Sequence, residues 1–224
     1  MYWNESFLDS LLEADRDALL KAGRSRQWQQ GELLLRAGDR ADAAIVVLEG
    51  LVKIHNTAAD GSEVILALTG PGELLGETSA VLDRVRSASA TALESVEGLV
   101  IPVGSFRSFL ADHQHATEAL LDLALGRLHV SDIRLVEFAT SDSLGRVTSR
   151  LIELAERFGT RRDGGEIELA LPITQEELAH WSASSLESMA RALRTLRALG
   201  LIQTDRRRLV VRDLDRLRQH SAAL

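Results

Sequence analysis

Apolar residues recur at helical spacing at the start of the chain and then give way to short apolar runs. Over residues 7–22 they lie three and four positions apart, which predicts a short amphipathic helix. Between residues 28 and 104 the apolar segments are short and separated by glycines. These segments lie at 33–35, 44–48, 51–54, 64–68 and 98–103. Many short strands joined by glycine-bearing turns, such as Asp60-Gly61, indicate a closed or sandwiched antiparallel β unit.

A second helical pattern runs from about Asp112 to about Phe138. Within it Leu128, Ser131, Leu135 and Phe138 have the spacing of a coiled-coil seam. A helix of this length has little of its own chain to bury it, so we interpret the seam as a dimer contact. The alternative is a helix that lies on its own β unit. The polar Ser131 within the seam needs a hydrogen-bond partner, and a ligand would supply one.

The last third of the chain predicts a DNA-reading module. Asp142 and Ser143 suit the N-cap of a helix over 144–158, and 159–166 has the composition of a loop. Residues 172–212 contain two short helical patterns, a tight turn of small residues between them, and a hairpin with three consecutive arginines. This order is that of a winged helix-turn-helix, which places one helix in the major groove of DNA.

Two capping boxes mark the starts of the two short helices. Thr174 is followed by Glu177, and Ser184 is followed by Glu187. The core-facing positions of the second helix are Met189, Leu193 and Leu196. The hydrophobic spacing therefore leaves another face of this helix for DNA.

That other face carries Glu187, Arg191 and Arg194. Arginine forks onto guanine O6 and N7, which makes Arg191 the strongest candidate for a base contact. Glu187 is either a contact to cytosine N4 or only the capping acid, and Arg194 is a phosphate contact before a base contact. The hairpin turn is either a wing or an ordinary charged turn. The expected DNA contacts are Ser185, Glu187, Ser188, Arg191, Arg194 and Arg207.

Composition and charge support this division. The 224 residues have a net charge of −7, but residues 1–142 hold 12 basic against 22 acidic residues, whereas residues 143–224 hold 14 against 11. Only the second module should approach phosphates. The chain shows neither a signal-peptide pattern nor a long apolar run, so we expect a soluble cytoplasmic protein without a membrane partner. It has no cysteine, which excludes disulfides, thiolate catalysis and cysteine-ligated metal centres.

Residues 70–90 suggest a site for a small anion. Gly76-Glu77 sits where a strand ends and a helical turn begins, and Arg86-Ser87 follows ten residues later. Backbone N–H groups at a helix start, one arginine and one hydroxyl together make a phosphate cradle. The Glu77 carboxylate would repel a phosphate, so accepting hydrogen bonds from a sugar hydroxyl is its natural task.

The order of a β unit, Gly76-Glu77, Arg86-Ser87-Ala88, a seam helix and a helix-turn-helix resembles the cyclic AMP receptor protein (CRP/FNR) family of bacterial transcription regulators. The resemblance covers the chain from about Leu8 to about Arg212. It implies an α+β fold in three parts. These are a jelly-roll-like antiparallel β-roll that binds the effector, a long dimerisation helix and a winged helix-turn-helix, over residues 1–111, 112–139 and 140–224.

The resemblance also implies a ligand, cyclic AMP, bound as an effector and not as a catalytic cofactor. Arg86 and Ser87 would hold its cyclic phosphate, Glu77 its ribose 2′-OH and Ser131 its adenine, with Asp132 reaching the adenine in the partner subunit. The implied ligand set is Gly76, Glu77, Thr78, Arg86, Ser87, Ser131 and Asp132. The implied macromolecular partners are double-stranded DNA, a second copy of the chain and RNA polymerase.

The chain departs from the family pattern at several positions. Thr78-Ser79 replaces a small apolar pair, and Asp132 is a carboxylate that costs free energy to bury. Leu186 stands where many members have a base-reading arginine, so we expect an unusual DNA site. Ala183 stands where the turn often has glycine.

Two alternatives to this reading differ in what the β unit does. The first keeps the fold and replaces cyclic AMP with another small effector or none. The second is a metal-dependent enzyme of the cupin kind, which needs several histidines on its strands, whereas the predicted strands offer only His55. We therefore expect a regulator and not an enzyme, with no metal, haem or iron–sulfur cluster, and we interpret His113 and His115 as solvated.

Overall fold

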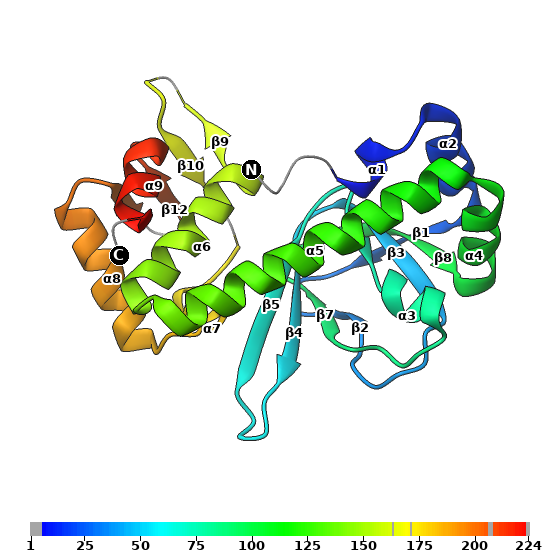
Figure 1. The fold of residues 1–224 in the computed structure, drawn as a ribbon, viewed down its shortest axis with the longest axis horizontal. Coiled ribbons are helices and arrows are strands. Elements are labelled where there is room, and N and C mark those ends of the chain that lie inside the picture. Colours follow the sequence, from blue (N-terminus) through cyan, green and yellow to red (C-terminus); the bar gives the residue numbers. More distant parts are fainter. Residues whose placement is uncertain (1–5, 163, 171, 206–207, 223–224) are drawn as a thin grey trace. The chain divides into compact units, whose positions relative to one another are not determined.

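The computed structural model describes residues 6–222 except 163, 171, 206 and 207. Its chain divides into two compact units, residues 1–130 and residues 131–224, and the boundary falls within the long helix. Figure 1 shows the elements of both units. The three-part division by function stays a prediction. No helix among the described residues is both long and apolar enough to cross a membrane.

The first helical segment is two helices and not one. Helix α1 (Phe7–Ser10) is capped by Ser6, whose hydroxyl accepts from the backbone N–H of Asp9. Helix α2 (Glu13–Ala22) follows after extended backbone at Leu11 and Leu12. The expectation of a single helix over 7–22 is therefore wrong. The two-residue break lets both Phe7 and Leu19 reach the same core.

Among the described residues of the first unit, eight strands form two four-stranded antiparallel sheets, which confirms the predicted β unit. One sheet has the order β1-β8-β3-β6 and the other β2-β7-β4-β5. The strands are β1 (Arg24–Trp28), β2 (Leu33–Leu35), β3 (Ala43–Glu49), β4 (Val52–Thr57), β5 (Glu63–Thr69), β6 (Leu74–Leu75), β7 (Ser89–Ala92) and β8 (Val96–Pro102). Gly61, with φ +85°, lies in the turn between β4 and β5, as predicted.

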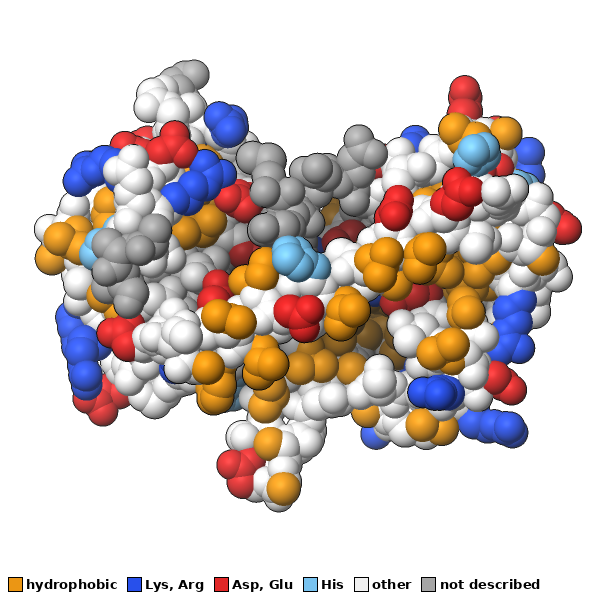
Figure 2. Space-filling view, viewed as in Figure 1, with side chains coloured by type: hydrophobic (Ala, Val, Ile, Leu, Met, Phe, Trp, Pro, Cys, Tyr) orange, Lys and Arg blue, Asp and Glu red, His pale blue; other side chains and the backbone are white. Residues whose placement is uncertain are grey.

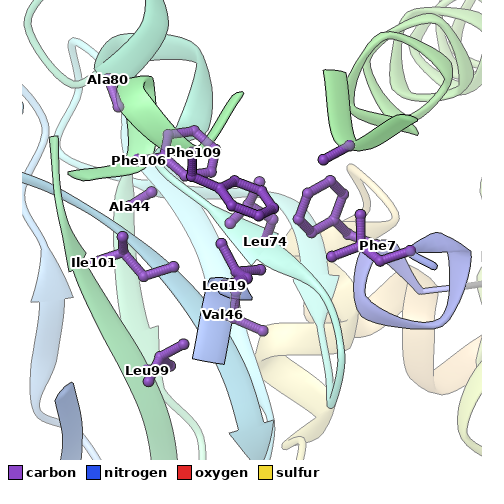
Figure 3. Close-up of a cluster of buried hydrophobic side chains, with 12 residues drawn as sticks. Phe7, Leu19, Ala44, Val46, Leu74, Ala80, Leu99, Ile101, Phe106 and Phe109 are labelled. Carbon is purple, nitrogen blue, oxygen red and sulfur yellow. The ribbon is translucent and has the colours of Figure 1, made fainter. Parts of the chain in front are cut away.

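Strand β3 is buried on both faces and contributes to two cores. Ile45 and Val47 pack with side chains from both sheets, so one core lies between the sheets. Ala44 and Val46 point the other way, into a cluster with helical side chains such as Phe106 (Figure 3). Alternation along a strand explains this, since successive side chains point to opposite faces.

The predicted long helix is preceded by a separate short one. Helix α4 (Val103–Asp112) has His113 as its C-cap, and helix α5 runs from Gln114 to Thr140. His113 stacks on Phe109 with 4.6 Å between ring centroids, and its Nδ1 lies 2.8 Å from the Phe109 carbonyl oxygen. The interpretation of His113 as solvated is therefore wrong, whereas the His115 side chain is 68% exposed.

The second unit contains a helical core and a small sheet. Its helices are α6 (Ser143–Phe158), α7 (Gln175–Trp181), α8 (Leu186–Ala198) and α9 (Leu214–Ala222). Its sheet has the order β11-β12-β10-β9, from β9 (Thr160–Arg161), β10 (Ile167–Leu169), β11 (Ile202–Asp205) and β12 (Arg208–Val211). Asp142 caps α6 as predicted. The segment 159–166 is not wholly loop, because Thr160 and Arg161 pair with β10.

Candidate effector and DNA-binding sites

Arg86 is a buried cation at the centre of the candidate effector site. Its side chain is 3% exposed. Nη1 donates to the Gly76 carbonyl oxygen at 2.8 Å, and Nη2 donates to the Ala43 carbonyl oxygen and to Asp42 Oδ1 at 3.1 Å. Three of its five N–H donors thus have partners among the described residues, and the others are available to an anion.

The only carboxylate that neutralises Arg86 within the described residues is an exposed one. The Asp42 side chain is 89% exposed, so solvent screens it and little holds it in place. A buried guanidinium with a weakly held counter-ion is a site where an incoming phosphate gains charge-assisted hydrogen bonds. Sequence reasoning missed Asp42, because nothing in its neighbourhood marks it as a partner of Arg86.

Gly76 gives the site its backbone geometry. It joins β6 to helix α3 (Glu77–Leu82) with φ +72°, a conformation that side chains with a Cβ rarely adopt. A Cβ at this position would lie 2.2 Å from Arg86 Nη1 and 3.0 Å from Leu35 Cδ1. Glycine is therefore required here for both conformation and space, and the expected strand-to-helix junction is confirmed.

Glu77 is buried beside this junction and held by an arginine from α5. Arg127 Nη1 donates to Glu77 Oε1 at 2.7 Å, and Arg127 Nη2 donates to the Leu74 carbonyl oxygen at 2.7 Å. Thr78 Oγ1 also donates to Glu77 Oε1, at 3.0 Å. Glu77 Oε2 accepts no hydrogen bond from the described residues, so it remains open to a hydroxyl donor.

The structure therefore brings Gly76, Glu77, Thr78 and Arg86 together around one strand-to-helix junction. Ser87 follows Arg86 and is exposed, and its carbonyl oxygen accepts from Asn56 Nδ2 at 3.0 Å. Ser131 and Asp132 are both exposed on α5, just beyond the boundary between the units. Arg127 is a further member that the sequence interpretation missed, because it reaches Glu77 from fifty residues away.

The predicted seam is an exposed apolar face in the single chain. Leu128, Leu135 and Phe138 are 58%, 69% and 61% exposed, and Leu121 and Leu125 continue the row toward the start of α5. Figure 2 shows hydrophobic side chains along this helix. A row of this kind favours contact with another surface, because single exposed leucines are common but an aligned series is not.

The first helix of the helix-turn-helix begins as predicted, and the second begins one residue later. Thr174 and Glu177 form both bonds of a capping box. The cap of α8 is Ser185, whose hydroxyl accepts from the backbone N–H of Ser188 at 3.1 Å. The predicted capping box at Ser184 is therefore wrong, because the Ser184 hydroxyl instead donates to the Ser182 carbonyl oxygen within the turn.

The two faces of α8 separate as the spacing predicts. Met189, Leu193 and Leu196 are buried. Glu187 and Arg191 lie on the exposed face with side chains 81% and 65% exposed, and Arg191 Nη2 donates to Glu187 Oε1 at 2.8 Å. Both side chains lie on the surface expected to face the bases, and Arg194 is also exposed.

Arg146 holds the turn between the two helices, a role that no sequence motif signalled. From α6 its Nε donates to the Ser182 carbonyl oxygen at 2.9 Å and its Nη2 to the Ala183 carbonyl oxygen at 3.0 Å. Ala183 has φ +48°, which is unfavourable for a residue other than glycine. These two hydrogen bonds stabilise the turn in that conformation.

The hairpin β11–β12 follows α8 as a wing would. Arg207 lies outside the described residues, so the structure leaves its predicted DNA contact as an expectation. Arg208 is directed elsewhere, because its Nε lies 2.6 Å from Glu168 Oε1 on β10. This arginine therefore supports the sheet.

Two parts of the chain, one around each candidate site, match known protein families. Residues 25–113 match the cyclic nucleotide-binding domain, and residues 145–220 match the Crp-like helix-turn-helix domain. The chain is 31% identical to the CRP-like cAMP-activated global transcriptional regulator of Mycobacterium tuberculosis, over 89% of each protein. It is 30% identical to the cyclic AMP receptor protein of Thermus thermophilus, over 84% of this chain and 83% of that one.

Solved structures share the fold. The c-di-GMP responsive global regulator CLP of Xanthomonas campestris superimposes with a TM-score of 0.76 and 21% identity, over 88% of this chain and 98% of that one. The Mycobacterium tuberculosis relative is by name a transcriptional regulator, which agrees with the regulator expected from the sequence.

Proposed function

The chain is a DNA-binding transcription regulator of the CRP/FNR family with a cyclic nucleotide-binding domain, and on that premise we propose that it is a homodimer controlled by cyclic AMP. The single observation that carries the effector is the buried Arg86 guanidinium, whose only carboxylate partner in the described part of the chain is exposed. The cyclic phosphate takes the free N–H donors of Arg86.

Glu77 and its neighbours supply the rest of the recognition. The open Oε2 of Glu77 accepts from the ribose 2′-OH, while Arg127 holds the other oxygen of the same carboxylate. This arrangement selects a ribonucleotide over a deoxyribonucleotide, since a missing hydroxyl leaves a buried acceptor unpaired. Ser87 contributes a hydroxyl to the phosphate.

The exposed row on α5 supports the homodimer. Two copies that pair through Leu128, Leu135 and Phe138 bury these side chains in a seam, and isologous pairing of this kind is the commonest assembly of soluble proteins. Ser131 and Asp132 then lie on the paired helices, where a ligand bound to one subunit touches the other. Cyclic AMP thereby favours one packing of the helices and hence one arrangement for DNA binding.

Calorimetry tests the effector directly. Cyclic AMP titrated into the protein should release or absorb heat, and Arg86→Leu should abolish that signal. Cyclic GMP and cyclic di-GMP serve as competing ligands, because a structural neighbour is responsive to the latter. If cyclic AMP gives no heat and one of the others does, the effector assignment is wrong. If none binds, the sensing half of the proposal fails.

A further inference from the structure

A cluster of buried charges joins the end of α5 to α6 within the second unit. Arg134 and Glu137 come from the last turns of α5, and Arg150, Glu153 and Arg157 come from α6. Glu153 is 5% exposed and accepts hydrogen bonds from all three arginines. A carboxylate buried to this degree is stable only when it is paired, so these contacts hold one another in place.

The geometry makes Glu153 the centre of this cluster. Arg134 Nη2 lies 2.9 and 3.0 Å from its two oxygens, and Arg150 Nη1 and Arg157 Nη1 each lie 3.1 Å from one of them. Arg150 also donates through Nη2 to Glu137 on α5. Burial lowers the pKa of Arg134 from the ordinary arginine value, and Glu153 opposes that effect. Two separate ion pairs therefore cross from α5 to α6.

The same arginines reach the first helix of the helix-turn-helix. The guanidinium carbons of Arg134 and Arg150 lie 5.7 and 5.6 Å from the ring centroid of Trp181, within cation–π range. Trp181 ends α7 and is 5% exposed. The end of α5 is thus tied both to α6 and to the helix that precedes the reading helix.

Residues of the charged cluster and residues of the seam alternate along the same turns of α5. Leu135 and Phe138, the exposed seam residues, directly follow Arg134 and Glu137 in the sequence. One side of these turns is therefore available to a second copy, while the other is fixed to the DNA-reading helices.

We propose that Arg134, Glu137, Arg150 and Glu153 are positioning residues that set the distance between the two reading helices of the dimer. Their ion pairs and their contacts with Trp181 hold the turns of α5 that carry Leu135 and Phe138 against the helix-turn-helix. Pairing of two copies through Leu135 and Phe138 therefore fixes the position of each α8. This inference rests on the proposed homodimer. According to this proposal, the cluster determines how strongly the dimer discriminates between operators whose half-sites differ in spacing.

The test compares Arg134→Gln with Arg157→Gln. Each variant removes one arginine from Glu153, but only the first cuts an ion pair between α5 and α6, because Arg157 and Glu153 are both on α6. Operators are first selected from random duplex DNA with the unmodified protein. One base pair is then inserted between the half-sites, which moves them apart by about 3.4 Å and rotates them by about a tenth of a turn.

The unmodified protein and Arg157→Gln should both lose at least about tenfold in affinity on the altered spacing, comparable with the penalty for a mismatched base pair. Arg134→Gln should lose less than about threefold, because one of the two ion pairs that attach α5 to α6 is gone and the reading helices are held less firmly. Circular dichroism confirms that both variants are folded. If Arg134→Gln discriminates as the unmodified protein does, or if both variants lose discrimination equally, the proposal is overturned.

Hydrogen exchange gives a test that needs no DNA. Amides of residues 134–140 should exchange at least about tenfold faster in Arg134→Gln than in Arg157→Gln, because local opening then breaks only the Arg150–Glu137 ion pair to α6 and no longer the Arg134–Glu153 pair as well. Equal exchange in the two variants contradicts the attachment. If the unmodified protein selects no operator, the DNA-binding function fails, and the exchange result alone decides the attachment.

Discussion

Two sites in this molecule bury an arginine, and they differ in where the opposing charge lies. Arg86 in the first unit is 3% exposed at its side chain, and its partner Asp42 is 89% exposed. Arg150 in the second unit is 7% exposed, and its partner Glu153 is 5% exposed. A buried cation with a buried counter-ion is locked, because removal of either leaves an unpaired charge. A buried cation with an exposed counter-ion can exchange that partner for a ligand.

The largest expected effect is on stability, and it comes from removing the Glu153 carboxylate from its buried ion pairs. Glu153→Ala should lower the free energy of unfolding by about 3–5 kcal/mol, because three arginines lose a buried partner. Asp42→Ala, the matched change at the other site, should stay within about 0.5 kcal/mol, as exposed substitutions do. Urea unfolding followed by circular dichroism measures both. Equal losses would remove the distinction between the two sites.

Removing the Arg86 guanidinium should affect the affinity for cyclic AMP more than the free energy of unfolding. Arg86→Leu should weaken cyclic AMP binding by at least about 100-fold, because charge-assisted hydrogen bonds contribute about 1.5–3 kcal/mol each. Fluorescence competition with a labelled cyclic nucleotide gives the affinity. Arg16→Leu, at an exposed ion pair with Asp9, is the control that should bind normally. An Arg86→Leu protein with unchanged affinity would mean that the phosphate binds elsewhere.

The sequence predicted the elements that rest on local patterns and missed the partners that come from distant segments. The strand-to-helix junction at Gly76 and the core face of α8 follow from residue type and spacing, and both were predicted. Arg127, Asp42 and Arg146 were missed because tertiary folding brings each to its partner. Ser184 shows a local failure, since its hydroxyl bonds within the turn instead of capping the helix.

A third comparison, with a smaller expected effect, is between Arg191 and Arg194, two exposed arginines on one face of α8. Arg191→Ala should cost about 1–3 kcal/mol of DNA binding and relax the preference at one base pair. Arg194→Ala should weaken all sequences alike and reduce the salt dependence of binding. Binding measured on a panel of operator variants at two salt concentrations separates these outcomes. Uniform weakening by both variants would reassign Arg191 as a phosphate contact.

The smallest effect is expected at Asp42 itself. Asp42→Asn removes the charge that competes with the phosphate for Arg86, so cyclic AMP affinity should rise by up to about fivefold, the range of an exposed ion pair. Asp39→Asn, three residues earlier and outside the Arg86 side-chain contacts, is the control. A fall in affinity for Asp42→Asn would show that the carboxylate supports the bound state.

The most direct test of the central claim is the affinity for a selected operator, measured with and without cyclic AMP, in the unmodified protein and in Arg86→Leu. If the exchangeable Arg86 site controls DNA binding, cyclic AMP should tighten binding of the unmodified protein by at least about fivefold, the lower range of allosteric coupling. It should leave Arg86→Leu unchanged. Equal operator affinity with and without cyclic AMP in the unmodified protein would contradict the claim.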